Sequence, residues 1–157
     1  MVKVLFACLG NICRSPMAQG IFQKMITDKK LTDKIYCDSC GIESFQVGKD
    51  PDERAQNILA WHEIHFEHKA RKITMDDLKN FDYVLIMDEV VEDYIKTLYA
   101  RTNGAKSKLI MMRKFDPIER SNVVPDPYYG ATDGFIKTYD ILHRCCEKLL
   151  EHILATS

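Results

Sequence analysis

Val2-Lys3-Val4-Leu5-Phe6-Ala7-Cys8-Leu9-Gly10-Asn11-Ile12-Cys13-Arg14-Ser15-Pro16 places a nearly continuous apolar run directly before a loop of small and polar residues. The run over residues 2–7 is typical of a strand that is buried on both faces of a sheet. Ser15 before Pro16 indicates the start of a helix, with Ser15 as its N-cap and Pro16 in the first helical position. Apolar residues then recur at helical spacing, at Met17, Ile21, Phe22, Met25 and Ile26. The stretch therefore predicts a strand, a loop and a helix in direct succession.

The alternation of strand and helix continues along the chain. Further strands are expected over residues 35–39, 82–87 and 108–112, and further helices over residues 51–61, 89–99 and 134–155. The second of the four predicted helices has one side made of Ala55, Ile58, Leu59 and His62, and the last has an inner face made of Leu142, Cys145, Cys146, Leu149 and Ile153. We expect one α/β domain over residues 1–157, a doubly wound four-stranded parallel sheet with helices on both faces. Ligands of such sheets bind at the carboxyl ends of the strands, where Cys8 lies.

The composition limits the classes of function. The chain has 157 residues and a net charge of −1, so it has no general electrostatic attraction to nucleic acid or to anionic membranes. No apolar run approaches the roughly 18 residues of a membrane-spanning helix, and no secretion signal is evident. The six cysteines are therefore expected to be reduced thiols of a cytoplasmic protein. Cys37 and Cys40 form a C-x-x-C pair, which is a spacing typical of zinc ligands. A zinc site is not expected, because no second C-x-x-C pair follows to complete a set of four ligands.

The loop after the first strand joins residue types that suit phosphoryl transfer. A guanidinium such as Arg14 binds two phosphate oxygens at once. The nearby cation and the helix N-terminus favour the thiolate form of a cysteine, so Cys8 is a candidate nucleophile. Asn11 suits the left-handed conformation that turns a backbone amide inward, and the Ser15 hydroxyl can serve as a cap or as a donor to the thiolate. The pattern predicts an oxyanion cradle with a thiol at its base.

The form C-L-G-N-I-C-R-S at residues 8–15 resembles the phosphate loop of the low-molecular-weight protein tyrosine phosphatases. Four further motifs resemble that family in order and separation, namely Asp38-Ser39-Cys40-Gly41, Pro51-Asp52-Glu53-Arg54-Ala55, His68-Lys69-Ala70-Arg71 and Asp126-Pro127-Tyr128-Tyr129. Unrelated thiol phosphatases share the loop alone. The whole set extends over essentially the whole chain and is specific to the family.

The resemblance implies hydrolysis of phosphotyrosine and aryl phosphate monoesters in two steps, through a phosphocysteine on Cys8. Asp126 would act first as the general acid and then as the general base. Protonation helps the phenolate to leave, because the pKa of its conjugate acid is about 10. No metal or cofactor is implied, because Arg14 and the loop amides take up the phosphate charge. The residues expected to bind phosphate are Leu9, Gly10, Asn11, Ile12, Cys13, Arg14 and Ser15.

The resemblance also assigns the surroundings of the loop. Ser39 and His68 match positions that hydrogen-bond the loop Asn and hold its shape. Phe45 lies where the family commonly has a Trp beside the cleft, and with Tyr128 and Tyr129 it would form an aromatic rim that selects phosphotyrosine. Cys13 matches a thiol that pairs with the nucleophile under oxidation. The implied partners are proteins or peptides that contain phosphotyrosine, together with free phosphate and oxyanion inhibitors.

Three other functions are compatible with this loop. An arsenate reductase needs a redox cysteine pair after the third strand, yet residues 81–112 contain no Cys. Protein arginine phosphatases of the same fold typically have Thr at the position of Ile12, where a hydroxyl suits a guanidinium substrate. A phosphopeptide-binding module without catalysis would not need the thiol, the guanidinium and the acid together. The phosphotyrosine phosphatase is therefore the preferred hypothesis.

Two segments depart from the family pattern, and one segment is irregular. Trp61-His62-Glu63-Ile64 stands where the family usually has a Gly, and Asp88 is followed by Glu89-Val90-Val91 without the usual Asn. Both departures concern local turns. Residues 113–133 show no clear periodicity, and a loop of that length in a compact domain is usually functional or disordered. The pair Tyr128-Tyr129 favours a functional loop.

Overall fold

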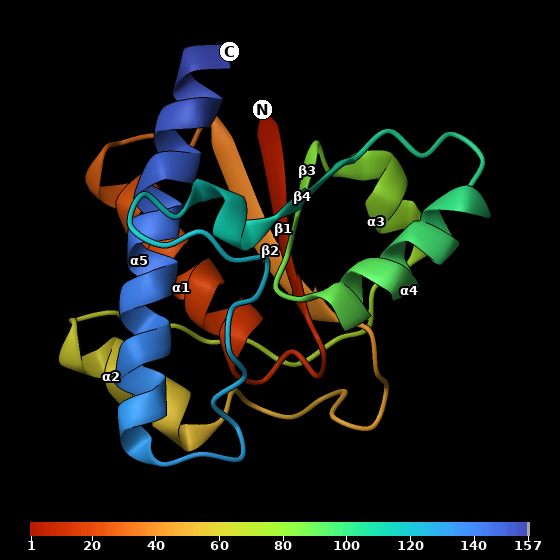
Figure 1. Cartoon of the computed structure of the whole chain (residues 1–157). Coiled ribbons are helices and arrows are strands. Elements are labelled where there is room, and N and C mark those ends of the chain that lie inside the picture. Colours follow the sequence, from red (N-terminus) through yellow and green to blue (C-terminus); the bar gives the residue numbers. More distant parts are fainter. Residues whose placement is uncertain (157) are drawn as a thin grey trace.

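The computed structural model describes residues 1–156 and contains a four-stranded parallel sheet with the order β2-β1-β3-β4 (Figure 1). The strands are β1 (Val2–Cys8), β2 (Ile35–Gly41), β3 (Tyr83–Ile86) and β4 (Lys108–Met111). The central strand β1 pairs with β2 from Val2↔Ile35 to Cys8↔Gly41, and with β3 from Val4↔Tyr83 to Ala7↔Ile86. The predicted α/β fold with a parallel sheet is confirmed.

Helices cover both faces of the sheet (Figure 1). α1 (Arg14–Asp28), α2 (Glu53–Trp61) and α5 (Thr132–Thr156) lie on one side, and α3 (Met75–Asn80) and α4 (Glu89–Ala100) lie on the other. Val4 and Phe6 of β1 pack in the core beneath the first group, whereas Leu5 and Ala7 pack in the core beneath the second. Both cores need apolar residues from the same strand, and this explains the continuous apolar run at the start of the chain.

The topology creates a crevice at the carboxyl end of the sheet. β1 leads into α1 on one face, whereas its neighbour β3 leads into α4 on the opposite face. The loops after these two strands therefore diverge, which is the arrangement in which open α/β sheets bind ligands. Cys8 is the last residue of β1, and Asp88 lies two residues after β3.

The expected N-cap role of Ser15 is wrong. α1 begins at Arg14, and the residue before it, Cys13, makes no side-chain capping hydrogen bond. The Ser15 hydroxyl is fully buried and hydrogen-bonds to Cys8 Sγ at 2.9 Å and to the carbonyl oxygen of Cys40 at 3.2 Å. It also accepts a hydrogen bond from Asn11 Nδ2 at 2.8 Å. The Ser15 hydroxyl thus makes its hydrogen bonds to the loop and to β2, and it does not cap the start of α1.

Other differences concern short segments and helix ends. The helix expected over residues 51–61 begins at Glu53, because the Asp52 carboxylate caps it by accepting from the Arg54 backbone N–H. His62 is the exposed C-cap of that helix and is not part of its buried side. α3 was not expected, since six residues are too few for a periodic pattern. A capping box between Thr74 and Asp77 starts it. A 3₁₀ helix (Met112–Phe115) follows β4.

Cys37 and Cys40 lie on opposite faces of β2. Cys37 packs in the core beneath α1, and Cys40 packs in the other core. Burial raises the pKa of the Cys37 thiol to about 12. The two thiols therefore behave as buried apolar groups and do not share a ligand. Within residues 1–156, no helix is long and apolar enough to cross a membrane.

The turn after α2 places a non-glycine residue in the left-handed region. Glu63 has a φ of 62°, a conformation that costs an L-residue roughly 1–2 kcal/mol. We expect Glu63→Gly to raise the free energy of unfolding by about 0.5–1 kcal/mol, because glycine adopts this φ freely but loses more chain entropy on folding. Urea denaturation measures the change. The matched control Glu147→Gly lies inside α5 and should lose about 1 kcal/mol. Equal losses for the two variants would contradict the strain at Glu63.

A buried ion-pair network fastens the segment after β4 to α5. Asp116, whose side chain is inaccessible, accepts from Arg113 Nε at 2.8 Å and from Arg144 Nε and Nη2 at 2.9 Å. Burial alone would raise the pKa of Asp116, but these hydrogen bonds outweigh it and hold that pKa well below its ordinary value. Arg113 is also buried, pairs with Glu119 and donates to the Val123 carbonyl at 2.7 Å.

Replacing Asp116 should therefore destabilise the fold in a pH-dependent way. Asp116→Asn weakens the pairing of buried Arg113, which keeps Glu119 and the Val123 carbonyl, so we expect a loss of about 1–3 kcal/mol at pH 7. The pKa of Asp116 is depressed in the fold, so its stabilising effect is present above the unfolded pKa of about 4 and is lost as the pH falls below it. Urea denaturation of both proteins from pH 7 to pH 3 should show the difference shrinking. A difference that stays constant over that range would contradict this role.

Candidate active site

A surface cavity opens at the carboxyl end of β1, with Cys8 at its base. Cys8 is 3% exposed, and its Sγ lies 2.9 Å from Ser15 Oγ. The loop after β1, residues 8–15, forms the floor and is called the phosphate loop below. The lining residues are Cys8, Leu9, Gly10, Ile12, Cys13, Arg14, Glu43, Phe45, Gln46, Asp126, Tyr128 and Tyr129. The cavity therefore joins the predicted nucleophile, guanidinium, acid and aromatic rim.

The buried side-chain amide of Asn11 holds the shape of the phosphate loop. Asn11 has a φ of 60°, as expected, and is fully buried. Its Nδ2 donates to Ser15 Oγ at 2.8 Å and to Ser39 Oγ at 3.0 Å. Its Oδ1 accepts from the Arg71 backbone N–H at 3.1 Å and lies 2.7 Å from His68 Nε2. Four partners, one at the end of the loop and three from β2 and residues 68–71, thus fix one side chain and with it the left-handed turn of the loop.

Ser39 and His68 lie behind the loop and do not line the cavity. They are 3.2 Å apart, and Ser39 Oγ also donates to Gln19 Oε1 at 2.6 Å. Burial lowers the pKa of His68 below its ordinary value and outweighs the opposing effect of Asp38. A neutral imidazole that donates from Nε2 satisfies the Asn11 oxygen. The geometry supports the predicted positioning role of both residues.

Gly41, at the end of β2, lets the phosphate loop approach the sheet. A Cβ atom at this position would lie 2.7 Å from the carbonyl oxygen of Leu9 and 2.9 Å from the carbonyl carbon of Gly10. Backbone atoms at such distances cannot move aside without reshaping the loop. The sequence motif at residues 38–41 contained this glycine, but its role became visible only through the contact.

Arg14 links the phosphate loop to β3 and to the predicted acid. Its Nη1 donates to Asp88 Oδ2 at 2.7 Å and to the Val124 carbonyl at 3.0 Å, and its Nη2 lies 3.6 Å from Asp126 Oδ2. Burial alone would lower its pKa, but Cys8, Asp88 and Asp126 together raise it. The guanidinium is 2% exposed and stays charged at the cavity floor.

Asp88 is a site residue that sequence reasoning missed. Its Oδ1 accepts from the Val91 N–H and caps α4, while its other oxygen pairs with Arg14. An Asp directly before an apolar helical run is a capping signal. Such a signal marks a helix start but does not indicate that the second oxygen would reach Arg14.

The rim of the cavity is aromatic and exposed. Phe45 is 68% and Tyr129 is 91% exposed, while Tyr128 packs partly against the main core. The rings of Tyr128 and Tyr129 meet edge to face with centroids 4.8 Å apart. Asp126 Oδ1 accepts from the Tyr128 backbone N–H at 3.1 Å, so the carboxylate is tied to the start of the rim.

Cys13 shares the cavity with Cys8 but differs in environment. It is 4% exposed, and burial, reinforced by Asp52 and Cys8, raises its pKa well above the ordinary value. Both cysteines are free thiols in this structure. Within the part of the chain that the structure describes, no group of three or more His, Cys, Asp or Glu side chains is arranged to hold a metal ion.

Comparisons with known proteins agree with this arrangement. The sequence pattern of the family described as low molecular weight phosphotyrosine protein phosphatase matches residues 3–156. A phosphatase of that name from Mus musculus is 41% identical over 152 residues, which cover 95% of this chain and 94% of that protein. A crystal structure of a protein tyrosine phosphatase from Entamoeba histolytica, with Hepes in its active site, has a TM-score of 0.92, 34% identity and 99% coverage of both chains.

One structural relative has a different described substrate. The crystal structure of a Drosophila arginine phosphatase also has a TM-score of 0.92, with 31% identity, and covers 97% of this chain and 98% of that one. The overall fold therefore does not separate the two substrate classes. The family pattern and the identity to the mouse enzyme are decisive at the level of family: this chain belongs to the low molecular weight phosphotyrosine protein phosphatases.

Proposed function

We propose that this chain is a protein-tyrosine phosphatase that hydrolyses phosphotyrosine and aryl phosphate monoesters through a phosphocysteine on Cys8. One observation carries the proposal: a thiol, a buried guanidinium and a carboxylate face one aromatic-rimmed cavity. Arg14 Nη2 lies 3.6 Å from Asp126, and Cys8 forms the base below them. The domain is proposed to extend over residues 1–157.

In the first step, the Cys8 thiolate attacks phosphorus in line with the ester oxygen. The S–P bond forms as the P–O bond to the phenolate breaks, and Asp126 donates its proton to the departing oxygen. Arg14 and the backbone N–H groups of the phosphate loop hold the other three phosphate oxygens, where negative charge is concentrated. Asp126 lines the cavity with a partly exposed side chain 3.6 Å from Arg14, which supports its role beside the leaving group.

In the second step, water replaces the phenol. Asp126, now a carboxylate, takes a proton from the water while the water oxygen bonds to phosphorus. The S–P bond breaks at the same time, and the Cys8 thiolate is restored. The Ser15 hydroxyl lies 2.9 Å from Cys8 Sγ and 3.2 Å from the Cys40 carbonyl oxygen, and it stabilises that thiolate by turning its single proton from the carbonyl to the sulfur. Asn11 Nδ2, which donates to Ser15 Oγ, orients the hydroxyl for this task.

The rim supports a preference for phosphotyrosine in proteins or peptides. Phe45, Tyr128 and Tyr129 offer aromatic faces to a phenyl ring whose phosphate reaches the Cys8 floor. A phosphoserine side chain is shorter and reaches less easily. Free phosphate and other oxyanions would compete for the same loop. Six free cysteines support a reducing, cytoplasmic setting.

Cys13 is proposed as the resolving thiol of Cys8. Both side chains line one cavity, and oxidation of Cys8 to a sulfenic acid would be followed by disulfide formation with loss of water. The disulfide protects Cys8 from irreversible oxidation and can be reduced by cellular thiols.

Two substitutions test the assigned chemistry. Cys8→Ser should lower kcat for p-nitrophenyl phosphate by more than about 1,000-fold, because the nucleophile is lost. Asp126→Ala should lower it by about 100-fold or more, because hydrolysis of the phosphocysteine loses its general base. The control Asp140→Ala removes an exposed carboxylate of α5 and should retain wild-type turnover. Wild-type turnover by Cys8→Ser would exclude the mechanism. Tight phosphopeptide binding without hydrolysis by the unaltered protein would instead identify a binding module.

Arginine phosphatase activity is the second candidate, favoured by the Drosophila relative. Ile12 lines the cavity floor with an apolar side chain and offers no hydroxyl to a guanidinium. We expect the wild type to prefer a phosphotyrosine peptide to the matched phosphoarginine peptide by at least about tenfold in kcat/KM, and Ile12→Thr to narrow that preference. The rate of phosphate release from each peptide gives kcat/KM for the wild type and for Ile12→Thr. Faster hydrolysis of phosphoarginine by the wild type would reverse the assignment.

A further inference from the structure

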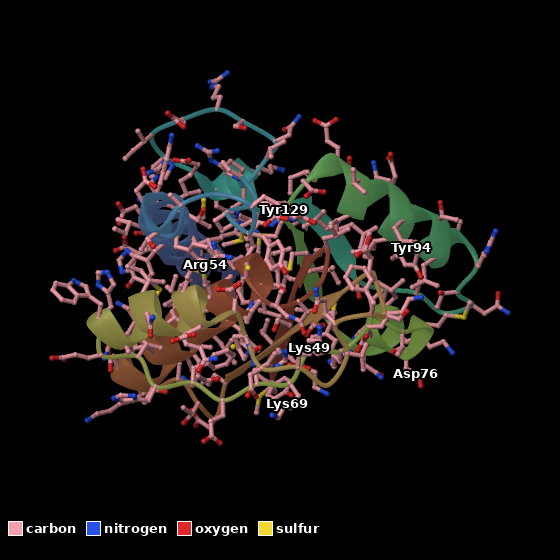
Figure 2. The ribbon with its side chains drawn as sticks, turned by 90° about the horizontal axis from the view of Figure 1, so that it is seen from below. Lys49, Arg54, Lys69, Asp76, Tyr94 and Tyr129 are labelled. Atoms are coloured by element: carbon pink, nitrogen blue, oxygen red, sulfur yellow. The ribbon has the colours of Figure 1, made fainter. Side chains whose placement is uncertain are left out.

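We propose that Arg54 is a positioning residue for the general acid. Its hydrogen bonds connect the segment that carries Asp126 to the phosphate loop, and they thereby fix the position of the acid relative to Cys8. This inference rests on the acid role proposed for Asp126. Arg54 lies near the start of α2, and in the view of Figure 2 it is on the side of that helix that faces Tyr129. It does not line the cavity.

The segment that carries Asp126 has little regular structure of its own. Residues 123–131, called the acid loop here, lie between the 3₁₀ helix and α5 and contain no helix or strand. Before the acid, Val124 is held by its N–H, which donates to the Met87 carbonyl at 2.8 Å, and by its carbonyl, which accepts from Arg14. Asp126 is two residues beyond that anchor. Its position therefore depends on what holds the loop on the other side.

Arg54 supplies the hold on that other side. Its Nη2 donates to the Tyr128 carbonyl at 2.8 Å, and its Nη1 donates to the Gly130 carbonyl at 3.0 Å. The guanidinium also lies over the Phe135 ring, 4.5 Å from its centroid, and 5.8 Å from the centroid of the Tyr128 ring. Two carbonyls of the acid loop are thus held by one side chain from another element.

The same guanidinium is connected to the phosphate loop through Asp52. Arg54 Nε and Nη2 donate to the two oxygens of the Asp52 carboxylate at 3.1 and 3.0 Å. The Asp52 backbone N–H donates to the Ile12 carbonyl at 2.8 Å. A continuous path of hydrogen bonds therefore runs from Ile12 beside the nucleophile to Tyr128 beside the acid. A planar guanidinium can make these bonds at once, whereas a lysine ammonium lacks the fixed fork.

Loss of this path should impair protonation of the leaving group more than binding of phosphate. A displacement of about 1 Å can cost about 100-fold in a reaction step that depends on orientation. Phenolate needs the proton as it leaves, whereas p-nitrophenolate is a weaker base and leaves with little help. A defect in acid placement therefore appears as selective loss with phenyl phosphate, and a general folding defect lowers the rates of both substrates by the same factor.

The experiment compares kcat/KM for phenyl phosphate and p-nitrophenyl phosphate in Arg54→Met, Arg54→Lys and the wild type. We expect Arg54→Met to lose about 10–100-fold with phenyl phosphate and about threefold or less with p-nitrophenyl phosphate, with Arg54→Lys between it and the wild type. The acidic-to-alkaline pH profile of Arg54→Met with phenyl phosphate should also lose part of its alkaline limb, which reports the acid. The control Arg101→Met, exposed at the C-terminal end of α4, should match the wild type. Equal loss with both substrates, or no loss, would overturn the inference.

The single variants Asp126→Ala and Arg54→Met, together with the double variant, separate this inference from the proposed function. If Asp126→Ala is selective for phenyl phosphate and Arg54→Met is not, Asp126 remains the acid and Arg54 has no positioning role. If Asp126→Ala itself lacks the selectivity, the proposed acid is wrong and the inference falls with it. The inference is supported if adding Arg54→Met to Asp126→Ala causes no further selective loss, because two residues that act on one proton transfer are not additive.

Discussion

The arrangement around Cys8 depends on one buried side chain, Asn11. Its amide must be satisfied inside the protein, and it is, by Ser15, Ser39, His68 and the backbone of Arg71. These partners come from α1, β2 and the segment before α3. The left-handed turn at Asn11 is therefore fixed by the whole tertiary structure and not by local preference alone. A buried amide that lost these partners would cost about 1–3 kcal/mol per unsatisfied group, so the loop cannot relax without a penalty.

The charges of the site are organised around that fixed loop. Arg14 is buried and shared between Asp88, which follows β3, and Asp126, on the acid loop. Its positive charge is partly balanced by these carboxylates. A phosphate entering the loop would compete with Asp126 for the guanidinium, and this leaves the carboxyl free to face the leaving oxygen. The helices after β1 and β3 leave toward opposite faces and bring Arg14 and Asp88 together, and the acid loop brings Asp126 to the same guanidinium.

Elements with a strong apolar pattern were predictable from the sequence, and the short elements without one were not. The strand before Cys8 followed from a continuous apolar run and the inner face of α5 from apolar residues at helical spacing, because each element fills a core with many contacts. α3 and the 3₁₀ helix escaped prediction, since a capping box and a few residues decide them. The Ser15 cap was wrong for a different reason. The hydroxyl had two possible uses, and the partner that decided between them, Cys8 Sγ, is defined only by the folded loop.

The sequence by itself determined the class of fold, the chemistry of the phosphate loop and, through its motifs, the residues Cys8, Arg14, Asp126, Ser39 and His68. The fold class and the loop chemistry follow from residue types and their spacing, whereas Asp126, Ser39 and His68 follow from the resemblance of their motifs to the family. Only the tertiary structure decided that Asp88 pairs with Arg14, that Gly41 makes room for the loop and that Arg54 lies between Asp52 and the acid loop. The contacts of Asp88 with Arg14, of Gly41 with the phosphate loop and of Arg54 with the acid loop each join residues 30 or more positions apart. Such contacts depend on how helices and strands pack, and no local pattern of residues encodes that packing.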